Sequence, residues 1–319
     1  MNYTSPKLLP NKIIIIDGIA RTGKLLLATL VSSFSKTEHF ELGRNFEDIS
    51  PSIKFKKIKI DYAEAFIKNN LNELIYNKYL SRNVNFRPTD RTGVYNSSNF
   101  KLYKKRLKTK EGDRVIKLIK KEKRNILFVT HDLMTTISSF NKLNLKYKMI
   151  YLYRNPFDTI ISWYKRGHGK RLGEDLREFS LLIKNKKKKF PWYQQLIGKF
   201  NKMEEVEACA TFIYHLNKNS IRNFKKLDKK YKKNILVFDY LEIIQNKNNE
   251  LKTISKFLKS SFTKKTNDLL KEERLGKINL DNYFINLEKR KKFIKSKINQ
   301  ELFFKLLDQE KKLNLNIYN

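Results

Sequence analysis

The sequence of 319 residues contains one cysteine, Cys209, and only four histidines. A single cysteine excludes an intrachain disulfide framework and a cysteine-based zinc site. The histidines also lack the His-x₃-His spacing of a paired ligand set, so we expect no metal site. The four are His39, His131, His168 and His215.

Long apolar runs are also missing. No run approaches the ~20 residues that a helix needs to cross a bilayer, and the N-terminal segment MNYTSPKLLPNK lacks the apolar core of a signal peptide. We therefore expect a cytoplasmic protein without a membrane span. Hydrophobic residues make up 40% of the chain and aromatic residues 13%, enough for a sizeable core, which argues against global disorder.

Acidic residues are few: 32 Asp and Glu stand against 69 Lys and Arg, a formal charge of +37. Such an excess can mark a surface for nucleic acid or an acidic glycan. Lysine far outnumbers arginine and is scattered along the chain, which favours a compositional bias instead. No helix-turn-helix, RRM or zinc pattern is present, so a basic nucleic-acid-binding protein is the weaker alternative. The charge should still concentrate anionic substrates.

Apolar runs that predict buried strands alternate with helical patterns along the chain. This alternation predicts an α/β fold with helices around a central, mostly parallel sheet. The strands are expected at residues 13–16, 125–131, 147–156 and 234–240, with helical segments at 61–80, 111–122, 132–146 and 200–230.

Three further segments carry weaker patterns. Residues 54–60 (KFKKIKI) alternate enough to predict an edge strand, and residues 36–52 are expected to be a loop. Residues 81–103 contain Gly, Pro, Asn and Ser with three arginines, which predicts a long loop of the kind that often forms a lid or a binding segment.

The C-terminal part, residues 249–319, has a helical pattern and is rich in lysine. We find no internal repeat and no Pro/Gly/Ser linker. We therefore expect a single domain over residues 1–319, with a core over about 12–260 and a helical extension over about 261–319.

Residues 12–34 join a predicted strand to a predicted helix through a glycine turn. Gly18 and Gly23 let the backbone approach an anion, and Arg21 and Lys24 add positive charge. The turn nearly matches G-x-x-x-x-G-K-[ST], but Leu25 stands where that motif has a hydroxyl for Mg²⁺. The turn predicts a phosphate cradle that works without a metal.

A second constellation lies in YLYRNPFDTIISWY, where Asn155 and Pro156 have the order of a helix start. Asp158 and Ser162 then share one helix face. Arg154 and Ser162 suit a terminal phosphate through charge-assisted hydrogen bonds. The alternative is that Arg154 merely pairs with Asp158.

His131 directly follows the apolar run ILFVT. A lone histidine at a strand end is more often structural, but a neutral imidazole there can serve as general base. The predicted strands end in the glycine turn, His131, Arg154 and Phe238. Ligands in open α/β sheets bind beyond the carboxyl ends of strands, so these features should meet at one edge.

These residues resemble the sulfotransferases that use 3′-phosphoadenosine 5′-phosphosulfate (PAPS). The pattern R-N-P-x-D-x-x-x-S-x-Y from Arg154 to Tyr164 is similar to the 3′-phosphate-binding segment of that family. The turn from Gly18 to Lys24 resembles its 5′-phosphosulfate loop, and VTHDL resembles the segment whose histidine is the catalytic base. The resemblance covers roughly residues 12–260 in the order of elements, and it implies a three-layer sandwich of the P-loop NTPase-like kind.

The resemblance implies transfer of a sulfuryl group from PAPS, without a metal, to a hydroxyl or amine of a small-molecule or carbohydrate acceptor. It implies three catalytic residues: His131, Lys24 and Arg21. It implies nine donor-binding residues: Gly18, Arg21, Thr22, Gly23, Lys24, Leu25, Arg154, Ser162 and Phe238, the last beside the adenine.

The sequence departs from the family pattern at Lys24 and Leu25, where the loop usually has two hydroxyl residues. It also departs at Val129, where cytosolic members often carry lysine. The nearest match to the late R-K-G segment of the family is Arg274-Leu275-Gly276. A P-loop kinase or NTPase, with Asp239 as metal carboxylate, is the nearest alternative function. We expect the acceptor to bind at residues 81–103, 165–177 and 187–195, and the last of these segments contains Trp192 and Tyr193.

Overall fold

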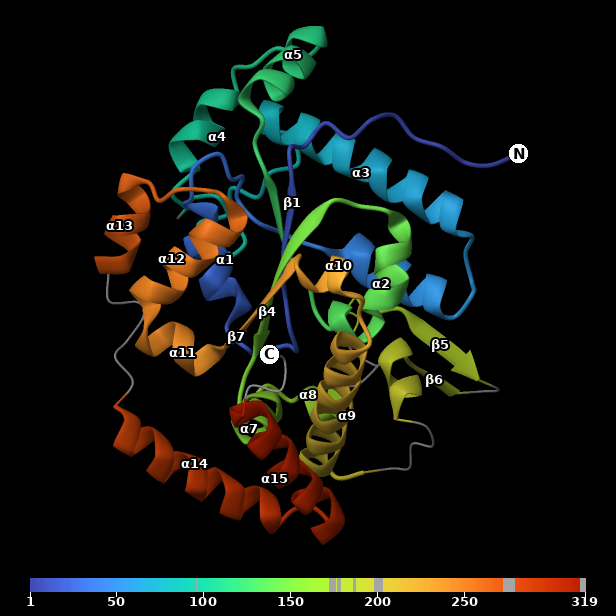
Figure 1. The fold of residues 1–319 in the computed structure, drawn as a ribbon, viewed down its shortest axis with the longest axis vertical. Coiled ribbons are helices and arrows are strands. Elements are labelled where there is room, and N and C mark those ends of the chain that lie inside the picture. Colours follow the sequence, from blue (N-terminus) through green and yellow to red (C-terminus); the bar gives the residue numbers. More distant parts are fainter. Residues whose placement is uncertain are drawn as a thin grey trace.

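The computed structural model describes residues 1–95, 97–171, 176, 179–185, 188–197, 203–271 and 279–315 (Figure 1). Its centre is a five-stranded sheet in the order β2-β3-β1-β4-β7, and all neighbouring strands in it are parallel. The predicted α/β class is confirmed. The strands are β1 (Ile13–Asp17), β2 (Glu41–Leu42), β3 (Ile126–Val129), β4 (Tyr147–Tyr153) and β7 (Ile235–Asp239). A separate antiparallel pair consists of β5 (Leu182–Asn185) and β6 (Lys188–Pro191).

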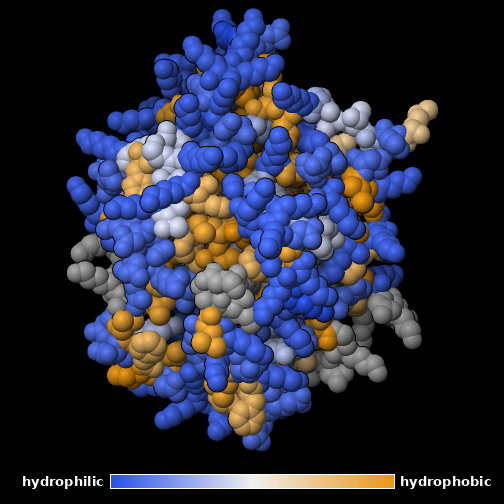
Figure 2. All heavy atoms as spheres, in the orientation of Figure 1, coloured by the Kyte–Doolittle hydropathy of each residue, from blue (hydrophilic) through white to orange (hydrophobic). Residues whose placement is uncertain are grey.

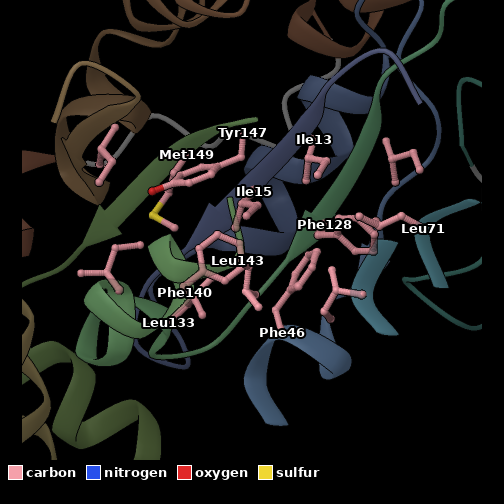
Figure 3. Packing of buried hydrophobic residues seen from close by; sticks show 14 of the residues in the cluster. Ile13, Ile15, Phe46, Leu71, Phe128, Leu133, Phe140, Leu143, Tyr147 and Met149 are labelled. Carbon is pink, nitrogen blue, oxygen red and sulfur yellow. The ribbon is translucent and has the colours of Figure 1, made fainter. Parts of the chain in front are cut away.

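Helices cover both faces of the sheet (Figure 1). Every residue of β1 is therefore buried, although its successive isoleucines point to opposite faces. Ile14 and Ile16 belong to a cluster with α1 (Lys24–Ser32), α11 (Tyr240–Gln245), α12 (Lys247–Leu258) and α13 (Lys264–Lys271). Ile13 and Ile15 face the other layer, with α2 (Arg44–Lys54), α3 (Ile60–Leu80), α5 (Asp113–Glu122) and α6 (Ile137–Phe140). Figure 3 shows Ile13 and Ile15 in this second layer beside Phe128.

A third hydrophobic cluster joins the C-terminal helices to the rest of the chain. Helices α14 (Leu280–Lys295) and α15 (Gln300–Asn314) contribute to it, together with α7 (Pro156–Tyr164) and α9 (Glu205–Lys225). The predicted helical character of this part is confirmed. Shorter helices are α4 (Phe100–Arg106), α8 (His168–Arg171) and α10 (Lys229–Lys232), with 3₁₀ turns η1 (Leu133–Thr136), η2 (Asn141–Leu143) and η4 (Trp192–Leu196).

Two local predictions were wrong. Residues 54–60 form no strand: Lys54 ends α2 and Ile60 begins α3. Their alternation arises because Ile58 packs on the core while the lysines around it face solvent, which a turn between helices also produces. Residues 36–52 are not a loop throughout but contain β2 and most of α2. The buried face of α2 includes Phe46 and Ile53, a helical spacing that Pro51 and the polar residues between them obscure.

The predicted loop at 81–103 is largely correct, since α4 begins only at Phe100. On the face shown in Figure 2, hydrophilic residues cover most of the surface, as the charge of the chain leads one to expect. In the described part of the chain, no helix combines the length and the apolar character that spanning a bilayer requires.

Candidate functional site

The glycine turn between β1 and α1 has a backbone shape that few residues can adopt. Positive φ angles occur at Gly18 (148°), Arg21 (75°) and Gly23 (91°). A Cβ atom at Gly18 would lie 2.2 Å from the carbonyl oxygen of Leu152, and one at Gly23 would lie 2.4 Å from the ring of Tyr240. Both glycines are therefore required. Turns with left-handed residues can gather backbone N–H groups around an anion.

Lys24, the first residue of α1, is only 4% exposed and folds back onto this turn. Its ammonium group donates hydrogen bonds to the carbonyl oxygens of Gly18 and Ile19, the latter at 2.6 Å. The hydroxyl of Thr22 donates to the same Ile19 oxygen at 2.9 Å. Burial lowers the pKa of Lys24 to about 8, although the nearby carboxylates of Asp17 and Asp132 oppose this shift. The ammonium group of Lys24 therefore loses its proton at a lower pH than that of an exposed lysine.

The predicted arginine and serine of the second motif lie directly against the glycine turn. Arg21 Nε donates to Ser162 Oγ at 3.0 Å, and Arg154 Nη1 donates to the carbonyl oxygen of Arg21 at 3.2 Å. Asn155 caps α7 as predicted, because its side chain accepts from the backbone N–H of Phe157 at 2.9 Å. Two motifs separated by more than a hundred residues therefore form one surface.

Positive charge gathers at this surface. Burial lowers the pKa of Arg21, and so do the like charges of Arg166, Arg154 and Arg91. Arg91 comes from the predicted loop at 81–103. Arg154 Nε is buried without a hydrogen-bond partner in the described residues. Like charges held together are costly unless an anion compensates them, so this cluster has the electrostatic character of an anion site.

Asp158 connects the arginine–serine surface to α14. Arg154 Nη2 lies 3.5 Å from Asp158 Oδ2, so the structural pairing considered from the sequence is present as well. Tyr283 Oη donates to Asp158 Oδ2 at 2.9 Å, and Arg290 forms an ion pair with Asp158 Oδ1. Both partners come from α14. Sequence reasoning missed them because no local pattern links α14 to α7.

His131 follows β3 at the same edge of the sheet and is held by Glu47 of α2. Its Nδ1 lies 3.0 Å from Glu47 Oε1, and its backbone N–H donates to the same oxygen at 2.7 Å. Because an ionised carboxylate can only accept, Nδ1 carries the proton and Nε2 has the free lone pair. Glu47 was missed because it lies in the segment expected to be a loop.

The electrostatic surroundings keep the His131 imidazole neutral. Burial lowers its pKa, and the charge of Lys24 lowers it further, while Glu47 acts in the opposite direction. For Glu47, burial disfavours ionisation, but His131 and Arg44 together hold its pKa below the usual value. The site therefore has a neutral histidine beside an ionised glutamate, close to the lysine of the glycine turn.

Asp132 is a further titratable group that the sequence did not single out. It is 8% exposed, has a left-handed backbone (φ 59°), and its Oδ1 has no hydrogen-bond partner in the described residues. Burial raises its pKa, against the opposing charge of Lys24. Asp132 and Lys24 are thus electrostatic partners next to His131.

The aromatic residue predicted beside an adenine, Phe238, is 6% exposed and packs in the cluster around α1, as does part of Leu25. Its role stays a prediction. Tyr240, two residues later, has its ring 4.7 Å from the Arg154 guanidinium and directly against Gly23. Tyr240 thus contacts both motifs. The only signal for it was its position just after a strand.

The structure describes only parts of the segments that are predicted to bind the acceptor. Trp192 is 6% exposed and its ring packs against Phe55 and Tyr193. Residues 165–177 and 187–195 are described only in part, and Arg274, Leu275 and Gly276 lie outside the described residues.

A family model matches most of the chain. Residues 10–315 match the family model described as "Sulfotransferase domain". A search of curated proteins found no match.

The solved structures that match this chain include two sulfotransferase domains. One, from the curacin biosynthetic pathway, has 15% identity and a TM-score of 0.44, covering 82% of this chain and 77% of that chain. The other, from the Synechococcus PCC 7002 olefin synthase, has 12% identity and a TM-score of 0.47, covering 98% of both chains. A retinol dehydratase structure with androsterone and the inactive cofactor PAP has 14% identity and a TM-score of 0.30, and the match covers 88% of this chain and 71% of that chain.

Proposed function

This chain belongs to the sulfotransferase domain family and is a sulfotransferase, and from that premise we propose that it transfers a sulfuryl group from PAPS to a hydroxyl or amine. The observation that carries the choice of donor is the contact between the glycine turn and the arginine–serine motif, through Arg21, Ser162 and Arg154. In this proposal the glycine turn takes the 5′ end of the donor and the arginine–serine motif takes its 3′-phosphate.

In this proposal the glycine turn holds the 5′ end of the donor. Backbone groups from Gly18 to Leu25, including Thr22 and Gly23, surround the phosphosulfate. Arg154 and Ser162 hold the 3′-phosphate through charge-assisted hydrogen bonds, which fixes the orientation of the donor. Phe238 lies near the adenine, and we add Tyr240 to this wall because its ring contacts Gly23 and Arg154.

His131 acts as the general base. Its Nε2 accepts the acceptor proton while the acceptor oxygen or nitrogen forms a bond to sulfur. The bond between sulfur and the bridging phosphate oxygen breaks, and 3′-phosphoadenosine 5′-phosphate (PAP) leaves with that electron pair. Arg21 and Lys24 stabilise the negative charge that develops on the sulfuryl and bridging oxygens. No step in this scheme requires a metal.

The alternative of a P-loop kinase or NTPase needs a metal carboxylate at Asp239 and a hydroxyl at residue 25. The Asp239 side chain instead caps α11, where it accepts from the backbone N–H of Leu241 at 3.1 Å, and residue 25 is leucine. These observations favour PAPS over a metal-bound nucleoside triphosphate.

The acceptor and the cellular setting remain proposals. We propose that the acceptor is a small molecule or a glycan and that the protein does not bind nucleic acid specifically. We also keep a cytoplasmic setting, since Cys209 is buried as a free thiol and needs no oxidising compartment.

A thermal-shift panel tests the donor. We expect PAP to raise the melting temperature of the protein more than ATP or ADP does, with or without Mg²⁺, because the turn and the arginine–serine motif fit two separate phosphates. ³⁵S-labelled PAPS then reports transfer to a set of acceptors. Stabilisation by ATP only when Mg²⁺ is present would overturn the proposal in favour of the kinase alternative.

A further inference from the structure

Arg166 lies two residues beyond the last residue of α7, the helix that carries Ser162. We propose that Arg166 is a further donor-binding residue, which contacts the 3′-phosphate beside Ser162 and makes binding depend on that phosphate. The inference rests on the proposed function, because it takes from it that Arg154 and Ser162 hold this phosphate. It adds to that position a residue from outside the arginine–serine motif, which ends at Tyr164.

The backbone places Arg166 on the same face of the helix as Ser162. The helical turn continues beyond α7, because the N–H of Lys165 donates to the Ile161 carbonyl oxygen at 3.0 Å. The N–H of Arg166 then donates to the Trp163 carbonyl oxygen, also at 3.0 Å. Side chains four residues apart on a helix are neighbours, with Cβ atoms about 5–6 Å apart. The guanidinium of Arg166 can therefore reach a phosphate that Ser162 holds.

The position of Arg21 supports the same placement. Its Nε donates to Ser162 Oγ at 3.0 Å, so the Arg21 guanidinium marks the space in front of Ser162. Burial is the largest cause that lowers the pKa of Arg21, and the charge of Arg166 comes next, ahead of that of Arg154. Two charges affect each other in this way only at short range. Arg166 thus lies close to the space that Arg21 and Ser162 share.

The charge of Arg166 is available to a ligand. Its side chain is exposed, and it forms no hydrogen bond or ion pair with any residue that the structure describes. Lys170, four residues later, differs in this respect, because its ammonium pairs with Glu205 at 2.6 Å. A guanidinium that is close to another cation and has no carboxylate beside it is an attractive contact for an anion.

The charge of the 3′-phosphate requires more than one cation. A phosphate monoester carries about −1.5 to −2 charges at neutral pH. Arg154 is already partly compensated, because its Nη2 lies 3.5 Å from Asp158 Oδ2. Arg290 pairs with the same carboxylate, so that the two arginines share it. In the proposed mechanism Arg21 serves the sulfuryl group. Arg166 supplies the second cation, and its planar guanidinium can place two N–H groups on phosphate oxygens.

Calorimetry with PAP and with adenosine 5′-phosphate (AMP), which lacks the 3′-phosphate, tests the proposal. The natural protein should bind PAP more tightly than AMP. Arg166→Ala should weaken PAP binding by roughly three- to tenfold, because an exposed charge-assisted contact is lost. AMP binding should stay nearly unchanged. Arg166→Lys should keep part of the affinity for PAP, since lysine retains the charge but not the paired N–H geometry.

Lys165→Ala is the matched control, because Lys165 is the neighbouring exposed cation and points about 100° away around the helix. It should leave the ratio of the two affinities unchanged. The melting temperature of each variant reports its folding, and Arg166→Gln replaces the alanine variant if that variant is less stable.

Three results would overturn the role of Arg166: an unchanged Kd for PAP in Arg166→Ala, an equal loss of PAP and AMP binding, or the same effect in Lys165→Ala. The last two would mean that only the general positive charge matters. A natural protein that binds PAP no more tightly than AMP would instead reject the proposed donor, and Arg166 with it. A preference for PAP that survives fully in Arg166→Ala would reject the role of Arg166 alone.

Discussion

The two sides of the carboxyl edge of this sheet treat charge in opposite ways. On the donor side, the guanidinium groups of Arg21, Arg154 and Arg166 lie close enough to disfavour one another. On the acceptor side, Glu47 compensates Arg44 and orients His131. A cluster of guanidinium groups with few carboxylate partners, here Asp158 beside Arg154, prepares a surface for an anion, whereas evenly paired charge prepares one for a neutral group. The arrangement of charge, rather than the total of +37, therefore distinguishes the two sides.

The two sides also differ in how the chain builds them. Most of the donor side comes from two short contiguous motifs, one after β1 and one after β4, and Tyr240 after β7 adds to it. The acceptor side combines residues from α2 and β3 that are far apart in the chain, such as Glu47 and His131 with a separation of 84 residues. The comparison can be tested by changing one side and measuring the function of the other.

The largest effect is expected on the acceptor side, from His131→Ala. Turnover should fall by roughly 10²–10⁴-fold, because a general base is lost. The Kd for PAP should not change, since the imidazole is not part of the donor surface. Labelled transfer and calorimetry measure the two quantities, with His215→Ala on α9 as the control. Near-normal turnover of a folded variant would remove His131 from the mechanism.

On the donor side, Arg154→Ala should weaken donor binding and leave turnover largely unchanged, the reverse of the His131→Ala effect. Losing charge-assisted hydrogen bonds to a phosphate should weaken PAP binding by roughly 10- to 100-fold. Turnover at saturating donor should change much less. Arg82→Ala is the control, because Arg82 forms an exposed ion pair with Glu111. If calorimetry gives the same Kd for the Arg154 variant and the natural protein, Arg154 does not hold the 3′-phosphate.

Glu47→Gln tests whether the carboxylate positions the base or only stabilises the fold. Turnover should fall about tenfold, because the hydrogen bond that selects the Nδ1–H tautomer loses its charge. Glu47 raises the pKa of His131, so its neutralisation should move the acidic limb of the kcat/KM profile to lower pH. Activity requires neutral His131 and is lost as pH falls through that pKa. Glu64→Gln on α3 is the control, and an unmoved limb would indicate a structural role.

Sequence patterns predicted the parts of the molecule that local chemistry determines. The parallel sheet follows from continuous apolar runs such as that of β1, which are typical of strands buried on both faces. The glycine turn and the Asn155 cap were also predicted, because a left-handed backbone and a helix start each demand particular residues at fixed spacing.

The residues that were missed depend on contacts between distant segments. Tyr283 reaches Asp158 across 125 residues, and nothing in the pattern of α14 indicates which helix it covers. Glu47 holds His131 across 84 residues, and nothing in the pattern of residues 36–52 indicates that contact.

The smallest expected effect concerns Lys24 and the pH dependence of donor binding. Burial lowers its pKa to about 8, so the ammonium loses its proton as pH rises through that value. The Kd for PAP should increase roughly fourfold between pH ~7 and ~8.5. Lys24→Arg should flatten this dependence, because a guanidinium stays protonated. Asp132→Asn should move it to lower pH, because the Asp132 carboxylate raises the pKa of Lys24. If calorimetry at constant ionic strength shows the same pH dependence in Lys24→Arg as in the natural protein, another group on the donor side titrates.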